Sequence, residues 1–202
     1  MKKVIVLTTS TGQGHNQAAK SLIDLLQKNN YECIKYDFLS NSSKFLKDII
    51  ISGYTVSAMS FPGIYGLIYK ITNNKLTNIL IDIPFLFIKK RLYNLIKLEK
   101  PDLIISTHPL GVGIMNKLKK QGLDIPFLCV VTDFKAHYSY ISNNVDIYIT
   151  GSNYTKKSLI DKNIEENKIY PLGIPIKESF FDRDENIPYI IKVSIYVYLY
   201  RN

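Results

Sequence analysis

Hydrophobic residues recur along the chain with two periods, which predict an alternation of short strands and helices. Residues 4–7 form a continuous apolar run rich in β-branched side chains, which is typical of a strand buried on both faces of a sheet. Helical spacing begins at Asn16 and places four apolar side chains on one helical face. These are Ala19, Leu22, Ile23 and Leu26. A strand, a turn of small residues and a helix, in that order, open a doubly wound α/β domain.

The same rhythm continues later in the chain and predicts a parallel sheet. Apolar runs that predict strands occupy residues 31–37, 102–106, 126–131, 145–150 and 168–172. One helix is predicted over residues 111–121. A second, short helix follows residues 151–153 and runs to about residue 162, and Ser152 or Asn153 can cap it. Strands that alternate with helices favour an α/β fold with a Rossmann-like, doubly wound parallel sheet, which we assign to residues 1–176.

Residues 45–100 interrupt this rhythm, and we predict that they form a mostly helical insertion. Residues 49–69 carry no formal charge and are long enough to span a bilayer, but internal glycines and a proline disfavour a transmembrane helix. Residues 79–88 are strongly apolar and run into a basic cluster at 89–91. An apolar surface beside a basic cluster suits the headgroup region of an anionic membrane. Two helices packed on the sheet, with a solvated basic end, are the alternative.

Small and polar residues gather where the predicted strands end. The segments are 9–15, 107–109, 133–137, 151–153 and Gly173. Parallel strands bring their carboxyl ends to one edge of a sheet, so we expect these segments to line one crevice, where such folds bind ligands. All three histidines of the protein, His15, His108 and His137, lie in this set.

The turn after the first strand has the features of an anion-binding site. Gly12 and Gly14 let the backbone approach a ligand closely, and the following helix start offers N–H groups without a helical partner. The turn lacks the third glycine of a dinucleotide fingerprint and the Gly-Lys-Ser/Thr sequence of a P-loop. His15 follows directly, and it is either a structural residue of the helix start or a functional residue at the mouth of the anion site.

Composition and charge narrow the class of partner. The 202 residues carry a formal net charge of +9, which favours nucleic acid, anionic lipid or a phosphorylated substrate. The lysines are dispersed and the sequence has no nucleic-acid recognition motif, so we expect no nucleic-acid partner. Cys33 and Cys129 have neither disulfide nor metal-site spacing, which fits a reducing cytoplasm. The apolar run near the N-terminus is too short for a signal peptide.

Five short motifs, taken in order and spacing, resemble those of a known family. They are TGQGHNQAA at 11–19, PGIYGLIY at 62–69, STHP at 106–109, VTDF at 131–134 with His137, and GIPI at 173–176. Together they resemble the monogalactosyldiacylglycerol synthase and processive diacylglycerol glucosyltransferase family, over residues 2 to about 192. Tyr138 and Tyr140 lie where that family usually has Trp, which is a departure from its pattern.

The resemblance implies a GT-B glycosyltransferase, which is built from two Rossmann-like domains. The N-terminal domain of such an enzyme holds the lipid acceptor, and the C-terminal domain binds the nucleotide sugar. The implied reaction transfers a hexose from a UDP-sugar to the free hydroxyl of diacylglycerol and makes a glycolipid, with inversion of the anomeric centre and without a metal or other cofactor. The implied location is peripheral, at the cytoplasmic face of the cell membrane, in contact with anionic lipids.

By the same resemblance, His15 and Asp133 are the catalytic residues. The displacement needs a base for the acceptor proton and a positive group near the departing diphosphate. Which of the two residues takes the proton stays open, and Asp133 is close enough in sequence to His137 to be paired with it. The residues implied to bind substrate are Gly12, Gly14, Pro62, Tyr65, His108 and His137.

The sequence accounts for only one of the two domains. A second domain needs on the order of 150 residues, whereas residues 177–202 form a short tail that includes the apolar, tyrosine-rich run 193–200. We therefore interpret the chain as the acceptor half of the enzyme, truncated by a frameshift near Lys192 and inactive by itself. A non-catalytic membrane- or lipid-binding module is the alternative function.

Overall fold

The computed structural model describes residues 1–10, 13–40 and 75–178. The chain forms two compact units, of which one comprises residues 1–37 and 100–202 and the other comprises residues 38–99. All six strands and both predicted catalytic residues belong to the first unit.

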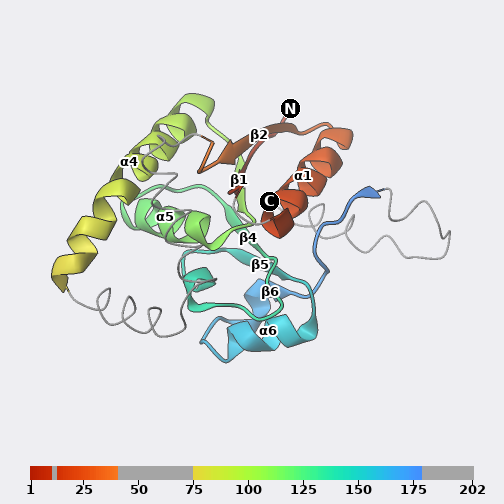
Figure 1. Ribbon diagram of the computed structural model, residues 1–202. Coiled ribbons are helices and arrows are strands. Elements are labelled where there is room, and N and C mark those ends of the chain that lie inside the picture. The colour runs from red at the N-terminus through yellow and green to blue at the C-terminus, as the bar shows by residue number, and fades with distance from the viewer. Residues whose placement is uncertain (11–12, 41–74, 179–202) are drawn as a thin grey trace. The chain divides into compact units, whose positions relative to one another are not determined.

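Six parallel strands form the sheet of the first unit, in the order β2-β1-β3-β4-β5-β6 (Figure 1). Their bounds are β1 (Lys3–Thr8), β2 (Glu32–Asp37), β3 (Leu103–Ser106), β4 (Phe127–Val131), β5 (Ile147–Thr150) and β6 (Ile169–Tyr170). The strand order reverses at β1, because β2 lies on one side of it and β3 on the other. Doubly wound sheets bind ligands outside the carboxyl ends of the strands at such a switch point. The predicted α/β fold class is confirmed.

The helices of the first unit lie at the predicted places between the strands. They are α1 (Gln13–Lys28), α5 (Pro109–Lys120) and α6 (Asn153–Ile160), with the 3-10 turns η1 (Tyr138–Tyr140) and η2 (Glu166–Lys168). Ser152 caps α6, as predicted, by accepting a hydrogen bond from the amide of Thr155. α1 begins at Gln13 rather than at Asn16. The prediction starts too late because the first turn of the helix is largely exposed and has no apolar side chain that would mark it in the sequence. His15 therefore lies inside the first turn of α1.

One part of the core lies between the sheet and α1. Val4 and Val6 of β1 pack against the four predicted apolar residues of α1, all of which are buried. Ile5 and Leu7 point to the other side of β1 and are also buried, so the strand is covered on both faces, as its apolar run predicts. This packing fixes both the carboxyl end of β1 and the beginning of α1.

The last strand, β6, is shorter than the predicted 168–172. Pro171 has no N–H to donate, and the amide of Leu172 donates to the carbonyl of Tyr170 instead of extending the ladder. The chain then turns at Gly173, whose φ of 94° favours glycine, and the amide of Gly173 donates to the carbonyl of Thr150. The segment after β6 is thereby tied to the carboxyl end of β5.

In the second unit, the structure describes a long helix, α4 (Lys75–Glu99). The helix occupies the later part of the segment that the sequence predicts to be a helical insertion. Ile88, Leu92 and Ile96 recur every fourth residue and are buried, so they define one apolar stripe. In the described part of the chain, no helix combines the length and the hydropathy needed to cross a membrane.

Several predictions fall on residues outside those described. The earlier part of the insertion, residues 41–74, contains Pro62 and Tyr65, and the tail begins at residue 179. The membrane-facing role of the insertion, the domain boundaries and the interpretation of the tail therefore stay predictions.

Candidate active site

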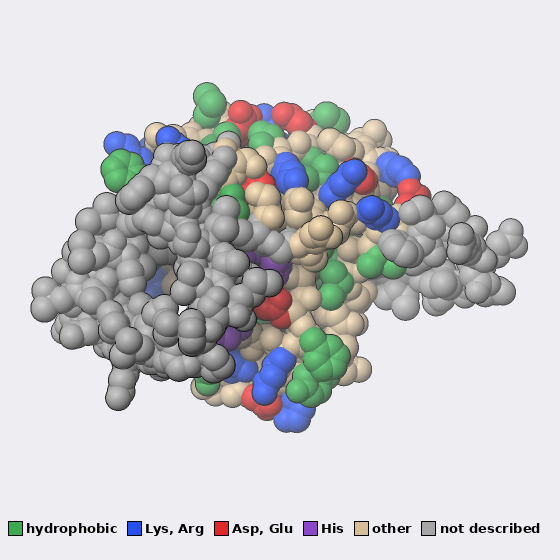
Figure 2. All heavy atoms as spheres, viewed as in Figure 1, with side chains coloured by type: hydrophobic (Ala, Val, Ile, Leu, Met, Phe, Trp, Pro, Cys, Tyr) green, Lys and Arg blue, Asp and Glu red, His purple; other side chains and the backbone are tan. Residues whose placement is uncertain are grey.

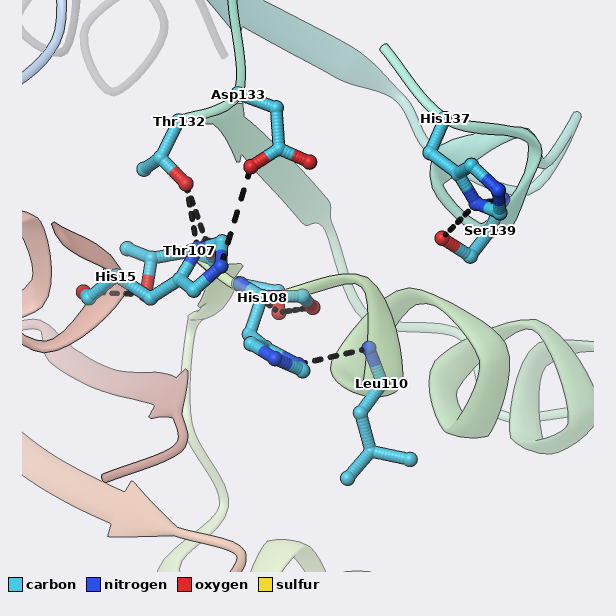
Figure 3. A network of polar contacts seen from close by, with 9 residues as sticks. His15, Thr107, His108, Leu110, Thr132, Asp133, His137 and Ser139 are labelled. Carbon is cyan, nitrogen blue, oxygen red and sulfur yellow. Dashed lines mark hydrogen bonds and ion pairs between the residues drawn. The ribbon is translucent and has the colours of Figure 1, made fainter. Parts of the chain in front are cut away.

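Three strand ends meet beside the switch point of the sheet and hold the predicted catalytic residues. His15 lies in the helix that follows β1, Thr107 follows β3, and Thr132 and Asp133 follow β4. These side chains converge in Figure 3. On the face shown in Figure 2, histidine and acidic side chains lie next to each other near the centre. The strand order thus brings His15 and Asp133 together, as predicted.

The imidazole of His15 is held in one tautomer by the backbone. Its Nδ1 lies 2.8 Å from the carbonyl oxygen of Thr107, which can only accept, so Nδ1 must carry a proton. The hydroxyl of Thr132 lies 2.5 Å from the same nitrogen. The hydroxyl of Thr107 donates in turn to the carbonyl oxygen of His15 at 3.0 Å. In the neutral ring, Nε2 is therefore the atom with a lone pair.

Asp133 faces this second nitrogen of His15. Its Oδ1 lies 4.0 Å from Nε2, which is too long for a direct hydrogen bond but close enough for an ion pair when the ring is protonated. The side chain of His15 is 18% exposed and that of Asp133 is 42% exposed, so solvent reaches both. A hydroxyl group in the solvent-exposed gap alongside these two atoms can contact Nε2 and the carboxylate at the same time. The arrangement suits proton removal from an alcohol, followed by stabilisation of the imidazolium.

His108 lies against His15 but serves the local structure. Its Nδ1 caps α5 by accepting a hydrogen bond from the amide of Leu110 at 3.1 Å. The two imidazole rings meet edge to face, with centroids 4.6 Å apart. Burial lowers the pKa of His108 to about 3, and the neighbouring His15 contributes in the same direction. His108 is therefore neutral at physiological pH, and its predicted role in substrate binding stays a prediction.

The predicted pairing of Asp133 with His137 is not found. His137 lies apart from the other two histidines in Figure 3 and caps η1, where its Nδ1 accepts from the amide of Ser139. The reason lies in the intervening loop, which is pinned to α6. The hydroxyl of Thr155 donates to the carbonyl of Phe134 at 2.8 Å, and the amide of Ala136 donates to the hydroxyl of Ser158 at 3.0 Å. The carboxylate of Asp133 faces Nε2 of His15 instead, at 4.0 Å.

The glycines near the site differ in how much space surrounds them. Gly12 lies outside the described residues. Gly14 lies in the first turn of α1, and a Cβ added there would meet nothing within 4 Å, so the space beside it is open. Gly111 is required by packing, because a Cβ there would lie 2.2 Å from the hydroxyl oxygen of Ser106. Gly111 thereby lets α5 approach the end of β3, which places His108 beside His15.

Sequence reasoning did not assign Thr107 and Thr132 to the site. Both residues stand within motifs quoted for the family, directly after predicted strands, and that position is the signal that could have found them. A further unassigned pair lies at the start of the glycine turn. There Asp37 is buried and accepts from the amide of Ser10 at 3.2 Å, which ties the end of β1 to the end of β2.

The fold of the chain resembles the fold of two solved structures. It resembles the apo lipopolysaccharide outer core galactosyltransferase WaaB, with 16% sequence identity and a TM-score of 0.52, over 86% of this chain and 45% of that one. It also resembles the UDP-GlcNAc 2-epimerase of Methanocaldococcus jannaschii solved with UDP-GlcNAc and UDP, with 16% identity and a TM-score of 0.51, over 86% and 47% of the two chains. The described sheet is thus the Rossmann-like N-terminal half of a GT-B fold.

Sequence comparison gives the family. The sequence model of the monogalactosyldiacylglycerol (MGDG) synthase family matches residues 15–176. The relatives named "Processive diacylglycerol beta-glucosyltransferase" from Bacillus cereus (strain B4264) and Bacillus mycoides (strain KBAB4) are 32% and 33% identical over 183 residues. Each match covers 88% of this chain and 46% of the relative, so the chain spans about half the length of the curated relatives it matches. The chain belongs to the monogalactosyldiacylglycerol synthase family of diacylglycerol glycosyltransferases, and the predicted family is confirmed.

Proposed function

We propose that this chain is the acceptor half of an enzyme that transfers a hexose from a UDP-sugar to diacylglycerol. The observation that carries the proposal is the 2.8 Å contact between Nδ1 of His15 and the carbonyl oxygen of Thr107, which assigns the tautomer of His15. A backbone carbonyl holds the proton on Nδ1, and the lone pair of Nε2 points into a gap bordered by Asp133. Membership of the family supports diacylglycerol as the acceptor.

In the proposed reaction, the acceptor hydroxyl lies in the gap alongside Nε2 of His15 and the carboxylate of Asp133. Nε2 of His15 takes the hydroxyl proton while the oxygen attacks the anomeric carbon of the sugar. The new glycosidic bond forms on the face opposite the departing UDP, which leaves with the electron pair of the broken bond. The carboxylate of Asp133 stabilises the imidazolium that results. The variant mechanism, in which Asp133 takes the proton directly, uses the same gap.

The UDP-sugar is proposed to bind a second Rossmann-like domain outside these 202 residues. The relatives named above are about twice as long as the matched region, which supports a donor-binding half beyond that region. We therefore expect no turnover when the chain alone is incubated with a UDP-sugar and diacylglycerol. The proposed location is peripheral, at the cytoplasmic face of an anionic membrane.

A non-catalytic lipid-binding module is the second candidate function, and one observation favours it. α4 exposes Leu86 and Phe87 close in sequence to the exposed Lys90 and Arg91. Apolar side chains beside basic ones suit an anionic membrane surface. This surface serves an enzyme equally well, so only a test of transfer separates the two functions.

The test is a chimaera in which residues 1–176 replace the corresponding half of the Bacillus cereus relative. We expect it to form radiolabelled glycolipid from a UDP-sugar and diacylglycerol. The variant His15→Asn should lower the rate by roughly 10²–10⁴, which is the usual worth of a positioned acid–base group. Circular dichroism should show unchanged folding, since the side chain borders solvent.

Two results would count against the proposal. A folded chimaera that binds vesicles but forms no glycolipid would favour the lipid-binding module. Near wild-type rates in His15→Asn and in Asp133→Asn would remove both residues from the chemistry. A large loss in Asp133→Asn alone would favour Asp133 as the base.

A further inference from the structure

Two consecutive residues after β4 face the two nitrogens of the His15 ring. The hydroxyl oxygen of Thr132 lies 2.5 Å from Nδ1, and the carboxylate of Asp133 lies 4.0 Å from Nε2. Figure 3 shows the dashed lines from both side chains running to the same imidazole. The proposed reaction gives Asp133 a part in the chemistry, but it gives none to Thr132. The geometry of the Thr132 contact indicates what its hydroxyl does.

Thr132 and Thr107 contact Nδ1 from different directions. The carbonyl oxygen of Thr107 lies 2.8 Å from Nδ1, and the hydroxyl of Thr132 donates to that carbonyl at 3.5 Å. A triangle with sides of 2.5, 2.8 and 3.5 Å places the two oxygens at roughly a right angle as seen from Nδ1. The hydroxyl hydrogen of Thr132 is directed at the carbonyl, so a lone pair of its oxygen is available to the Nδ1 proton. That proton is thus shared between two acceptors in a three-centre hydrogen bond.

Two acceptors on different strands constrain the ring more than one acceptor does. Thr107 follows β3 and Thr132 follows β4. A ring that is held by one hydrogen bond can still turn about the axis of that bond, and Nε2 would then swing away from Asp133. A second contact at roughly a right angle opposes this rotation. The carbonyl therefore accounts for the position of the proton, and the hydroxyl accounts for the direction in which Nε2 points.

The hydroxyl of Thr132 is itself held in place. Threonine is branched at Cβ, which restricts rotation about χ1. The loop that follows is tied to α6 at two points. The hydroxyl of Thr155 donates to the carbonyl oxygen of Phe134 at 2.8 Å, and the amide of Ala136 donates to the hydroxyl of Ser158 at 3.0 Å. A residue that orients a reacting group must be rigid itself, and Thr132 meets this condition.

We propose that Thr132 is a positioning residue, whose hydroxyl fixes the plane of the His15 ring so that Nε2 faces the acceptor hydroxyl beside Asp133. This inference rests on the proposed function, because it concerns the same base. Thr132 takes no proton from the acceptor and does not touch it. Its contribution is the orientation of His15, and a displacement of about 1 Å in a reacting group can cost up to about 10²-fold in rate.

The first test observes the ring in the 202-residue chain by NMR. The protein has three histidines, so ¹³C at histidine Cε1 gives three ring signals, which single His→Asn variants assign. Thr132→Val keeps the shape of the side chain and removes the hydroxyl. We expect it to lower the order parameter of the His15 ring from about 0.85 to below about 0.6. The rings of His108 and His137 should not change. Nitrogen chemical shifts should show the His15 proton still on Nδ1, since the carbonyl of Thr107 remains.

The second test measures transfer in the chimaera with the Bacillus cereus relative. Thr132→Val should lower kcat by about 10- to 100-fold and leave KM for diacylglycerol unchanged, because orientation of the base matters in the transition state and not in binding. Thr132→Ser keeps the hydroxyl and should recover most of kcat.

Thr150→Val is the matched control. Its hydroxyl lies at the end of the neighbouring strand β5 and donates to the carbonyl of Ser152 at 3.2 Å, so the substitution also deletes a hydroxyl that is bonded to a main-chain carbonyl. It should keep the kcat of the unsubstituted chimaera and the rigid His15 ring. Amide spectra verify that each variant is folded, and Thr132→Ala replaces Thr132→Val if the buried methyl groups of valine prevent folding.

Four results would overturn the role of Thr132 and leave the proposed function standing. If the His15 ring stays rigid and kcat is unchanged in Thr132→Val, the carbonyl of Thr107 orients the ring without help. A higher KM with unchanged kcat would place Thr132 in contact with the acceptor. A kcat that Thr132→Ser does not recover assigns the effect to packing. An equal loss in Thr150→Val assigns it to the stability of the fold.

Failure of the proposed function gives a different pattern. A chimaera that forms no glycolipid with threonine at position 132 contradicts the transfer reaction, and the ring measurement still decides whether Thr132 orients His15. A proton on Nε2 of His15 in the wild-type chain would overturn both, because the lone pair would then face Thr107 and Thr132 instead of Asp133.

Discussion

At the scale of single residues, the three histidines show how strongly the surroundings decide what one side chain does. His15 borders solvent and has its Nδ1 proton held by a backbone carbonyl. Nδ1 of His108 accepts the hydrogen bond that caps α5, and the ring is largely shielded from water. His137 is exposed and caps a single 3-10 turn. Nε2 of His15 lies 4.0 Å from the carboxylate of Asp133, which is why the proposed chemistry rests on His15.

The low pKa of His108 predicts that the fold loses stability in acid. The pKa of histidine is about 6.5 in an unfolded chain and about 3 in this fold. Between these pH values the unfolded chain binds more protons, so stability falls as the pH is lowered. The wild-type free energy of unfolding should therefore fall between pH 7 and pH 4.5. In His108→Asn, which keeps a capping side chain, we expect this fall to be smaller by about 2 kcal/mol. Urea unfolding at the two pH values measures this.

The exposed His137 provides the control for that measurement. His137→Asn also replaces a capping histidine, but the side chain is solvated. Its stability should follow the wild-type dependence on pH. If His108→Asn shows the same acid loss as His137→Asn, the acid sensitivity arises elsewhere in the protein.

For two buried tyrosines, we expect removal of the hydroxyl to have opposite effects on folding stability. Tyr140 is fully buried, and within the described part of the chain its hydroxyl makes no hydrogen bond of good geometry, although Thr132 and Asp133 lie close enough to act on its pKa. Tyr148 is equally buried, but its hydroxyl donates to the carbonyl of Tyr140 at 2.8 Å and accepts from the amide of Ser142 at 3.0 Å. We expect Tyr140→Phe to leave stability unchanged or raise it by up to about 1 kcal/mol, and Tyr148→Phe to lower it by about 1–3 kcal/mol.

Thermal and urea unfolding of the two variants decide this prediction. A marked loss of stability in Tyr140→Phe would mean that its hydroxyl has a partner in solution. Burial raises the pKa of both phenols, so both are protonated at neutral pH and the comparison is not complicated by ionisation.

At the scale of elements, α5 packs closely against the end of β3 at the buried Gly111, whereas Gly113 is exposed. A Cβ on Gly111 would lie 2.2 Å from the hydroxyl oxygen and 3.0 Å from the Cβ of Ser106, whereas a Cβ on Gly113 would meet nothing within 4 Å. Gly111→Ala should therefore destabilise the fold by about 1–3 kcal/mol through overpacking. Gly113→Ala should stabilise it by about 0.5–1 kcal/mol, because alanine favours a helix.

The two glycine variants lie in the same helix and differ by the same methyl group, so they control for each other. Midpoints of urea unfolding give both changes in stability. Equal effects of the two substitutions would contradict the close approach of α5 to the end of β3. In the chimaera, Gly111→Ala should also lower the rate, because it disturbs the turn that places His108 against His15.

The elements were predictable from the sequence because their burial is regular. Continuous apolar runs indicated β1, β3 and β4, and the spacing of Ala19 and Leu22 indicated the buried face of α1. The first turn of α1 was missed, since an exposed helical turn leaves no hydrophobic pattern. The family was predictable from motif order, which does not depend on burial.

The site was only partly predictable. The rule that parallel strands end at one edge brought His15 and Asp133 together correctly. The pairing of Asp133 with His137 failed, because nearness in sequence says nothing about a loop that two hydrogen bonds from α6 turn aside. The contact of Nδ1 with the carbonyl of Thr107 was missed for another reason. Every residue has a carbonyl, so the sequence cannot mark the one that matters.

At the scale of the whole molecule, the positive net charge of the chain predicts how it associates with membranes. The chain should sediment with vesicles that contain anionic lipid, and binding should weaken at high salt because ions screen the attraction. Lys90 and Arg91 of α4 are exposed beside exposed apolar residues. Replacing both with Gln should weaken binding more than replacing Lys120 and Lys157, two exposed lysines of the first unit.

The paired variants remove the same charge from the chain, so the comparison separates a local effect from that of net charge. If the two double variants lose vesicle binding equally, the interaction depends on the net charge of the protein and not on the location of the charges. Binding to neutral vesicles as strong as to anionic ones would exclude an electrostatic contribution altogether.

The partner that holds the proton on His15 is a main-chain atom, and this has a consequence for how the site can change over time. No point mutation deletes a carbonyl oxygen, and a peptide group does not titrate in the pH range of living cells. The backbone contact that favours this tautomer therefore depends on the pairing of β1 and β3, while the Thr132 hydroxyl is the side-chain group that contacts the same nitrogen. A substitution of a side chain around the site therefore leaves this carbonyl contact, and the proton that it holds on Nδ1 of His15, in place.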